Sequence, residues 1–304
     1  MSGAAAPPVI AIFGPTAVGK TAVAVELAGV LRERGEDPVA VSADALQVYR
    51  GLEALTGAPG PGELARLEHR LLAFLDPSDT FSVGEFMPLA HAEIDRARAD
   101  GRRPIVVGGT GLYLRAALTE LSLAPPPPPE LRARLEEAVA ARGPAAMHPE
   151  LRTRAPAAAA AIEPTDRTRI VRSLELLELG AEPPATAGSE LWSEDTRVPT
   201  RLFGLTMERE ALYARIDVRV DSIVAAGGAA EARRADGAGA SRTARAALGF
   251  EELLAGDTDG MRRRTRQYAR RQLTWMRKLE SVTVLDATER SARELAERIA
   301  ADAG

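Results

Sequence analysis

The apolar residues near the N-terminus form short, continuous runs rather than an alternating pattern. Residues 8–13 (Pro-Val-Ile-Ala-Ile-Phe) and 39–42 (Val-Ala-Val-Ser) are each typical of a strand that is buried on both faces. Between them, valines and leucines recur at helical spacing over residues 20–34, and Gly35 ends that pattern. The order of these elements predicts a βαβ unit.

The same alternation continues as far as residue 118. Residues 63–75 and 83–99 carry apolar side chains at helical spacing, which predicts two amphipathic helices. Residues 104–107 (Pro-Ile-Val-Val) predict a third buried strand. Strands that alternate with helices indicate the α/β class, in which helices flank a parallel sheet.

The pattern changes after residue 118. Five consecutive prolines, 125–129, form a stiff and extended spacer that neither a sheet nor a helix interior accepts. The alanine- and arginine-rich sequence that follows is helical in pattern and has no candidate strand. We therefore expect an inserted all-helical subdomain over residues 119–199, which separates the two parts of the core, 1–118 and 200–304.

The pattern of the core resumes after the insertion. Residues 200–206 predict a strand that returns to the sheet, and residues 282–285 predict a final strand, followed by an amphipathic helix over 288–301. Between these two strands the pattern predicts four helical stretches, which start at Glu208, Ala229, Thr243 and Met261.

Composition narrows the class of protein. The 304 residues are 45% hydrophobic and 27% charged, which is enough to bury one large core or two smaller ones. No apolar run approaches the roughly 18 residues of a membrane helix, and no basic residue precedes Lys20 as in a signal peptide. We expect a soluble, cytoplasmic monomer with no membrane partner. The lack of cysteine excludes disulfides, thiolate metal sites and a cysteine nucleophile.

The spacing of the histidines and the net charge narrow the possible functions further. His69, His91 and His148 lie far apart without metal-ligand spacing, so we expect ordinary structural or surface roles for them. The net charge of −4 argues against a generally cationic surface for nucleic acid, although local patches remain possible. Of the 39 basic residues only Lys20 and Lys278 are lysines, and all others are arginines. We therefore expect a lysine to have a specific role where it occurs.

One motif carries specific chemistry. Residues 14–21 (Gly-Pro-Thr-Ala-Val-Gly-Lys-Thr) fit the phosphate-loop pattern between the first strand and the first helix, and only about 0.002 chance matches are expected in this composition. Backbone N–H groups of such a loop surround phosphate oxygens, Lys20 adds a cation, and Thr21 can hold Mg²⁺. The predicted diphosphate site comprises Gly14, Pro15, Thr16, Ala17, Val18, Gly19, Lys20 and Thr21. The motif does not distinguish ATP, GTP or another diphosphate ester.

Further blocks make the sequence distinctive. They are residues 42–51, 81–86, 108–113, 164–172 and 265–275. Together with the phosphate loop they strongly resemble the tRNA dimethylallyltransferase (tRNA isopentenyltransferase) family of bacterial type, in the same order and over nearly the whole chain. Two departures affect minor substrate contacts: Ala45 replaces the serine that usually follows the aspartate, and residues 55–59 (Leu-Thr-Gly-Ala-Pro) replace a lysine-containing segment.

The resemblance implies a reaction and its partners. Enzymes of this family transfer a dimethylallyl group from dimethylallyl diphosphate to the exocyclic amine of the adenosine 3′ of the anticodon. The implied fold is a P-loop NTPase-like core with an inserted helical subdomain, which would hold the anticodon stem-loop of tRNA while the target adenine is flipped out. The implied cofactor is Mg²⁺, which helps to neutralise the departing diphosphate.

Several residues are candidates for the chemistry. Asp44 ends the second strand, where parallel α/β proteins place ligands, and we expect it to be the general base that takes the amine proton. Helix capping or a link to the metal ion are the alternatives for Asp44. Lys20 and Thr110 would contact the diphosphate or the substrate. Arg215 and Arg219 would also face the diphosphate. The alternative for these two arginines is a surface ion pair with Asp217 or Asp221.

Contacts with tRNA are expected from both parts of the chain. The basic segment 261–278, with Tyr268 and Trp275, carries eight positive charges and no negative one, which favours RNA or diphosphate contact over a merely solvated helix face. Trp275 itself is expected in the core. The resemblance implies tRNA contacts for Asp44, Ala45, Leu46, Gln47, Thr110, Arg132, Thr168, Arg169, Ile170, Val171, Arg172, Arg245, Gly249 and Phe250.

Three rival functions fit part of this pattern. The first is transfer of the same group to free AMP or ADP, the second is a small-molecule kinase that uses ATP, and the third is a P-loop RNA-binding switch without catalysis. The proline-bounded insertion and the basic segment argue against the kinase and the free-nucleotide enzyme. A switch would need nucleotide hydrolysis or nucleotide-linked binding.

Overall fold

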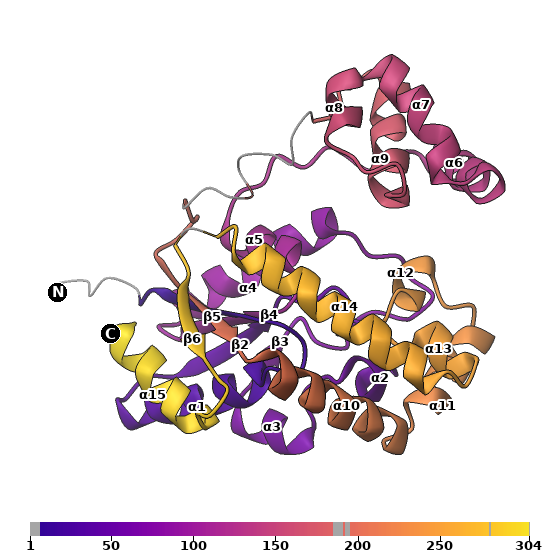
Figure 1. Cartoon of the computed structure of the whole chain (residues 1–304). Coiled ribbons are helices and arrows are strands. Elements are labelled where there is room, and N and C mark those ends of the chain that lie inside the picture. The colour runs from indigo at the N-terminus through magenta and orange to yellow at the C-terminus, as the bar shows by residue number, and fades with distance from the viewer. Residues whose placement is uncertain (1–6, 185–190, 192–194, 280, 304) are drawn as a thin grey trace. The chain divides into compact units, whose positions relative to one another are not determined.

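The structure is a computed structural model that describes residues 7–184, 191, 195–279 and 281–303. It divides into two compact units (Figure 1). The core unit comprises Met1–Glu120 and Glu194–Gly304, and the helical unit comprises Leu121–Ser193. The sequence prediction set the insertion at 119–199.

A six-stranded parallel sheet forms the centre of the core unit. The strands are β1 (Val9–Phe13), β2 (Pro38–Ser42), β3 (His69–Arg70), β4 (Arg103–Gly108), β5 (Thr200–Thr206) and β6 (Thr283–Asp286). Their order in the sheet is β3-β2-β4-β1-β5-β6, and every pair is parallel. All residues of β1 and β2 are buried, as continuous apolar runs require. The α/β class with a parallel sheet is thereby confirmed.

Helices cover both faces of this sheet. α1 (Lys20–Glu33) packs on α15 (Ala292–Asp302), and α4 (Val83–Ala99) packs on α5 (Gly111–Leu118). Figure 1 shows these two pairs on opposite faces of the strands. α4 begins where the periodicity predicts because Ser82 and Glu85 form a capping box. α15 begins at Ala292 rather than at residue 288, because Ser291 is its capping residue.

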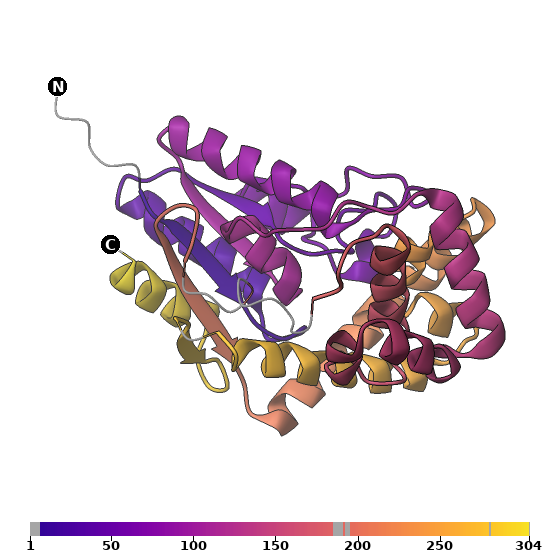
Figure 2. The ribbon, with the colours of Figure 1, turned by 90° about the horizontal axis from the view of Figure 1, so that it is seen from above.

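Seven further helices complete the core unit within the described residues. They are α2 (Glu53–Thr56), α3 (Pro61–Arg66), α10 (Arg209–Ala225), α11 (Gly228–Gly237), α12 (Arg242–Arg245), α13 (Phe250–Leu254) and α14 (Thr258–Met276). Seen from above, the purple helix α4 and the golden helix α14 lie on either side of the strands (Figure 2). Five of these helices stand where four were predicted. Gly249, with φ +93°, turns the chain between α12 and α13 and divides the third predicted stretch.

The helix predicted over residues 63–75 is wrong. α3 ends at Arg66, and the chain then forms β3, which pairs in parallel with β2 at the edge of the sheet. The backbone amide of Ala40 donates to the carbonyl of Glu68 over 2.8 Å. Leu71 then adopts φ 57°, in the left-handed region that a helix does not allow. Pairing with β2 therefore overrides the helical spacing of the apolar side chains.

The described residues of the helical unit form four α-helices: α6 (Pro129–Arg142), α7 (Pro144–Arg154), α8 (Pro156–Ala160) and α9 (Arg167–Glu178). Proline stands at the first position of α6, α7 and α8, where its missing N–H costs no hydrogen bond. Asp166 caps α9 by accepting from the backbone N–H of Arg169. Leu135, Met147 and Leu174 belong to the core of this unit. The described residues of the insertion contain no strand.

Candidate active site

The phosphate loop connects β1 to α1. Gly19 is the capping residue of α1 and has φ +104°, so the first backbone N–H groups of the helix face away from its body and are available to an anion. The Lys20 ammonium donates to the carbonyls of Gly14 and Pro15, both at 2.9 Å. Burial lowers the pKa of Lys20 to about 8, an effect that nearby Asp44 opposes and Arg219 adds to.

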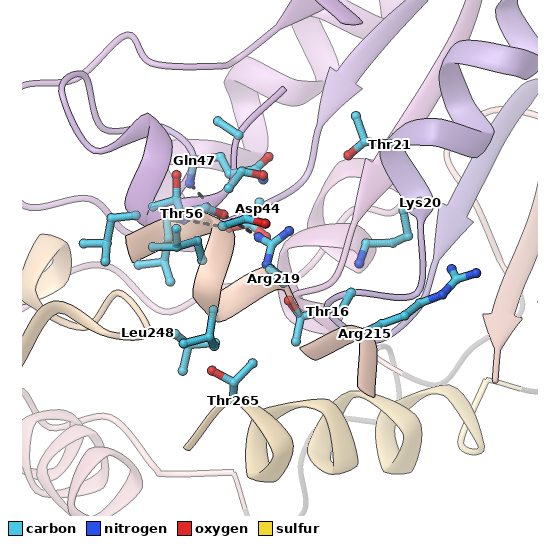
Figure 3. A pocket seen from close by; sticks show the side chains of 18 of the residues that line it. Thr16, Lys20, Thr21, Asp44, Gln47, Thr56, Arg215, Arg219, Leu248 and Thr265 are labelled. Carbon is cyan, nitrogen blue, oxygen red and sulfur yellow. Dashed lines mark hydrogen bonds between the residues drawn. The ribbon is translucent and has the colours of Figure 1, made fainter. Parts of the chain in front are cut away.

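A cavity of about 720 Å³ lies at the carboxyl end of the sheet. Its walls include Thr16, Lys20 and Thr21 from the phosphate loop and Asp44, which follows β2 (Figure 3). One oxygen of the Asp44 carboxylate accepts from the backbone N–H of Leu46 over 2.9 Å. Asp44 therefore closes a turn and also faces the cavity, so the capping alternative and a chemical role are compatible.

Two arginines of α10 reach the same cavity. Arg219 donates to the carbonyl of Thr56 over 2.9 Å, and Figure 3 shows its guanidinium beside Asp44. Burial lowers the pKa of Arg219, while Asp44 opposes the shift. A side chain at Gly57 would come within 2.1 Å of the Arg219 guanidinium, so this close approach requires glycine. Arg215 donates to the carbonyl of Val18 over 3.3 Å.

The surface alternative for these two arginines is wrong. Asp217 instead binds Arg266 of α14 at 2.7 Å, and Asp221 binds Arg262 of the same helix. These aspartates lie on the side of α10 that meets α14, because one helical turn separates them. Arg215 and Arg219 remain directed to the phosphate loop and to the cavity.

α14 contributes Gln272 and Thr265, which the sequence did not single out, and Tyr268, which it did. Gln272 is buried, its side-chain carbonyl accepts from the backbone N–H of Thr16 over 2.8 Å, and its amide donates to the carbonyl of Gly109 over 2.7 Å. It thus joins the loops that follow β1 and β4. Thr265 and Tyr268 also line the cavity. The signal was present, because these residues recur every three or four positions along one helix face.

Thr110 lies two residues after the end of β4 and is not among the residues that line the cavity. Its hydroxyl is hydrogen-bonded to the Tyr268 hydroxyl at 3.1 Å. Burial raises the pKa of Tyr268 to about 12, and Asp44 adds to that shift.

Trp275 is half-buried and packs over Gly111, where even a methyl group would come within 2.3 Å of its ring. The sequence prediction of a core tryptophan is thus met only in part.

The donor set suits a magnesium ion that phosphate oxygens also bind. Thr21 and Asp44 line the cavity beside Lys20. Within the part of the chain that the structure describes, no group of three or more carboxylates and imidazoles could hold a metal by itself. Mg²⁺ commonly binds through one or two protein oxygens together with phosphate oxygens and water, so the residues present fit such an ion.

The predicted tRNA residues near the cavity divide by position. Leu46 and Gln47 line it, and the Gln47 amide donates to the carbonyl of Gly57 over 3.2 Å. Ala45 lies in the same turn but is not part of the lining. Contact of these three residues with RNA stays a prediction.

Within the helical unit, two predicted tRNA arginines hold the structure together. Arg132 binds both oxygens of the Glu175 carboxylate at 2.7 and 2.8 Å. Arg172 binds Glu175 at 3.1 Å and donates to the carbonyls of Ala124 and Pro125 at 2.8 Å, which ties the proline segment to α9. Because Glu175 is completely buried, these arginines first serve to neutralise it.

Their neighbours on α9 split between surface and core. Thr168 and Arg169 are exposed. Ile170 and Val171 belong to the hydrophobic core of the helical unit, so their side chains do not form a surface for RNA. Contact with tRNA at these two positions stays a prediction, and it would have to come from the backbone, because the apolar face of α9 must be buried.

The third predicted group lies around α13. Arg245 binds Asp236 and Glu251, and its guanidinium stands 5.1 Å from the centre of the Phe250 ring. Phe250 is completely buried and Gly249 is buried as well, so among these residues only the half-buried Arg245 side chain is accessible to a ligand. A direct contact of the Phe250 side chain with tRNA is therefore not supported.

The histidines have the ordinary roles that the sequence predicts. His69 is hydrogen-bonded to the carbonyl of Leu67 at 2.7 Å, His91 to that of Ala116 at 2.9 Å, and His148 to that of Ile162 at 2.9 Å. Each imidazole thus satisfies a local backbone carbonyl, and none of them lines the cavity described above.

Comparison with known families gives the same assignment as the motifs. The IPP transferase model matches residues 47–279, and an isopentenyl transferase model matches residues 7–86. The chain belongs to the IPP transferase family. Both models together span the phosphate loop, Asp44, the helical unit and α14, so the family pattern includes every wall of the cavity.

Relatives of this family are similar along their whole length. A tRNA dimethylallyltransferase from Kineococcus radiotolerans is 42% identical, covering 96% of this chain and 95% of the relative. One from Symbiobacterium thermophilum is 40% identical, covering 95% and 92%. The crystal structure of a tRNA isopentenylpyrophosphate transferase from Bacillus halodurans is 34% identical, with a TM-score of 0.69 over 97% of this chain and 96% of that one. These likenesses confirm the P-loop core of the predicted fold.

A eukaryotic dimethylallyltransferase that was crystallised acting on tRNA shares the fold at a TM-score of 0.71 and 24% identity, covering 93% of this chain and 74% of that one. No helix within the described residues combines the length and the hydrophobicity that a bilayer crossing requires.

Proposed function

We propose that this IPP transferase family member transfers the dimethylallyl group of dimethylallyl diphosphate to N6 of the adenosine 3′ of the anticodon in tRNA. The observation that carries this proposal is a single cavity that joins a phosphate loop to a strand-end carboxylate. The departing diphosphate is stabilised by positive charge, and the attacking amine is assisted by a proton acceptor. One side of the cavity provides cations and the other provides a carboxylate.

The phosphate-loop side serves the leaving group. The N–H groups at the start of α1, the Lys20 ammonium, and the Arg215 guanidinium supply positive charge where the C–O bond breaks and negative charge develops on the diphosphate. A desolvated cation acts more strongly than a solvated one, because the surrounding dielectric screens it less. Gln272 holds Thr16 and the β4 loop in register for this contact.

The Asp44 side serves the nucleophile. The lone pair of the adenine amine is delocalised, so attack of N6 on the allylic carbon is assisted when Asp44 takes the N–H proton as the N–C bond forms. Diphosphate leaves with the electrons of the C–O bond. Arg219 lies beside the Asp44 carboxylate and places a positive charge next to it (Figure 3). Thr110, which is hydrogen-bonded to Tyr268 of the cavity lining, would help to orient the substrate.

Mg²⁺ is part of this proposal. Thr21 would hold it together with diphosphate oxygens and water, and the ion would supply charge neutralisation for the leaving group. The chain's own residues provide the remaining positive charge.

The helical unit supplies the proposed anticodon-arm contacts. Thr168 and Arg169 are exposed on α9, while Arg132 and Arg172 keep that helix joined to the proline segment. A tRNA substrate sets this reaction in the cytoplasm, and because one chain provides every wall of the cavity we propose that a monomer is active.

The deciding experiment offers labelled dimethylallyl diphosphate to the protein with tRNA, AMP or ATP in separate reactions. We expect label only in tRNA, at N6 of the adenosine 3′ of the anticodon, and only when Mg²⁺ is present. Equal transfer to AMP would replace tRNA by a free nucleotide as the acceptor. Phosphate release from ATP without prenyl transfer would favour a kinase or a switch.

A further inference from the structure

Tyr268 lines the donor cavity, the cavity beside the phosphate loop, yet no step of the proposed reaction uses its hydroxyl. The phenol oxygen stands 3.1 Å from the hydroxyl oxygen of Thr110, which follows β4. Burial raises the pKa of Tyr268 to about 12, so the phenol keeps its proton at neutral pH. It is therefore a neutral hydrogen-bonding group rather than a base.

Thr110 occupies the capping position of α5, but its side chain does not cap that helix. A threonine at this position usually accepts a hydrogen bond from a backbone N–H of the first helical turn. Within the described residues, the Thr110 hydroxyl is instead hydrogen-bonded to Tyr268 alone. The direction of the Thr110 proton is thus set by a residue 158 positions away rather than by the local backbone.

Gln272 determines which of the two hydroxyls donates. Its side-chain carbonyl accepts from the Thr16 backbone and its amide donates to the Gly109 carbonyl, which fixes the end of the side chain that carries the N–H groups. This amide also acts as a hydrogen-bond donor to the phenol, which lowers the pKa of Tyr268 against the effect of burial. A phenol oxygen that accepts from Gln272 directs its own proton to its other partner, Thr110. The Thr110 oxygen then accepts, and its own proton is left for the substrate.

The two hydroxyls belong to the side of the cavity where the nucleophile is expected. The negative charge of Asp44 reaches the phenol, because it adds to the rise in the pKa of Tyr268. Asp44 accepts a proton from the adenine amine in the proposed reaction. A second group of this side that donates a proton would complement a lone pair close to that amine.

We propose that Tyr268 is a positioning residue, which turns the Thr110 hydroxyl outward as a hydrogen-bond donor to a ring nitrogen beside the amine of the substrate adenine. The inference rests on the proposed function, because it takes adenosine as the prenyl acceptor. Adenine presents a lone pair at N1 and at N7, on either side of its N6 amine, whereas guanine has a carbonyl oxygen in place of the amine. The order of donor and acceptor at Thr110 and Asp44 therefore matches adenine and opposes guanine.

The test is a double-mutant cycle of variants that lack one or both hydroxyls. Single-turnover rates of prenyl transfer to a synthetic anticodon stem-loop RNA would be measured at saturating donor for Thr110→Val, Tyr268→Phe and the double variant. We expect a loss of roughly tenfold for Thr110→Val and roughly three- to tenfold for Tyr268→Phe, as for one hydrogen bond. The double variant should be no slower than Thr110→Val, because Tyr268 acts only through Thr110.

Analogues of the target adenosine identify the atom that accepts the hydrogen bond. RNA with 1-deazaadenosine or 7-deazaadenosine at the target position lacks one ring nitrogen. One of the two analogues should slow the wild type by roughly tenfold and slow Thr110→Val and Tyr268→Phe clearly less. The KM for dimethylallyl diphosphate should stay unchanged in Tyr268→Phe, whereas a general loosening of α14 beside the phosphate loop would raise it.

The matched control is Tyr213→Phe on α10, which removes the hydroxyl of another half-buried tyrosine outside the lining of the donor cavity. Its rate should equal that of the wild type. Tyr268→Phe keeps the aromatic ring, whose centre lies 5.6 Å from the Arg271 guanidinium, so the packing of α14 is preserved.

The outcomes separate this inference from the proposed function. If the wild type prenylates the RNA but the effects of Thr110→Val and Tyr268→Phe are additive, Tyr268 does not act through Thr110 and the inference is wrong while the reaction stands. If neither analogue slows the wild type and Tyr268→Phe raises the KM for dimethylallyl diphosphate, the Thr110 proton serves the diphosphate instead. Lack of transfer to RNA by the wild type would contradict the proposed function and, with it, this inference.

Discussion

Lys20 shows how burial tunes a single residue for its task. It is one of two lysines among 39 basic residues, and its ammonium is held by two loop carbonyls in a desolvated position. Arginine could not reproduce this, because a guanidinium is larger and keeps its charge when buried. The lowered pKa of about 8 brings the loss of the proton into an accessible pH range.

The first prediction concerns this pKa. As the pH rises above about 8, the ligand-free protein loses the Lys20 proton, and binding of an anionic donor must then include protonation. Donor affinity should therefore fall by up to about tenfold per pH unit in that range. Titration of the donor analogue at constant ionic strength measures it. Lys20→Met should bind weakly with a flat profile, and an unchanged profile in this variant would assign the titration to another group.

Asp44 carries the second prediction. Asn at this position keeps an oxygen to accept from Leu46 but cannot take a proton at neutral pH. Asp44→Asn should therefore retain stability and tRNA affinity and lose roughly 10²- to 10⁴-fold in the rate of prenyl transfer. Single-turnover kinetics with saturating donor and tRNA would measure this. A rate close to that of the wild type would leave Asp44 with capping alone.

At the scale of the element, α14 forms one wall of the donor cavity, the cavity beside the phosphate loop. Thr265, Tyr268 and Gln272 line this cavity from one face of the helix, because side chains three or four positions apart share a face. Arg262 and Arg266 of the same helix bind aspartates of α10, which holds the two helices together.

Gln272 allows a test of this element. Gln272→Met keeps the side-chain length but removes both hydrogen bonds, which leaves the Thr16 N–H and the Gly109 carbonyl without their partner. A lost buried hydrogen bond costs about 1–2 kcal/mol, so the KM for dimethylallyl diphosphate should rise roughly tenfold or more. Steady-state kinetics at saturating tRNA would show it, with exposed Gln267→Met on the same helix as control. Equal KM values for the two variants would reduce Gln272 to a packing residue.

At the scale of the whole molecule, the cavity and the buried Glu175 cluster belong to different units. Every residue that lines the donor cavity belongs to the core unit, while Glu175 and its two arginines belong to the helical unit. Burial raises the pKa of Glu175, but hydrogen bonds from Arg132 and Arg172 outweigh it and hold the pKa below its ordinary value of 4.5. Its contribution to stability is therefore present at neutral pH and lost as the pH falls through the lowered pKa.

Separate effects on the two units are the fourth prediction. Glu175→Gln should lower the free energy of unfolding of the helical unit by about 1–3 kcal/mol, because it removes a buried carboxylate from two arginines. Glu178→Gln, in the same helix but at an exposed position, should cost clearly less, because surface ion pairs contribute little to stability. Calorimetry would resolve the transitions, and donor affinity should stay unchanged in both variants. A weakened donor affinity in Glu175→Gln would mean that the two units are energetically coupled.

The sequence alone determined the strands that carry the site and the chemistry at their ends. Continuous apolar runs, the phosphate-loop glycines and the aspartate after β2 are local signals, so they predicted β1, β2, β4 and the positions of Lys20 and Asp44. The family motifs added the reaction. These inferences held because each depends on residues that are close together in the chain.

Only the tertiary structure decided the remaining features, because each depends on a distant partner. The two-residue strand β3 has no periodicity of its own and exists by pairing with β2, which the spacing of leucines could not indicate. Gln272 meets Thr16 across 256 positions, and Arg262 meets Asp221 across 41. A run of basic residues has the same pattern whether or not its charges are paired, and only the fold shows that Arg262, Arg264 and Arg266 of α14 bind carboxylates.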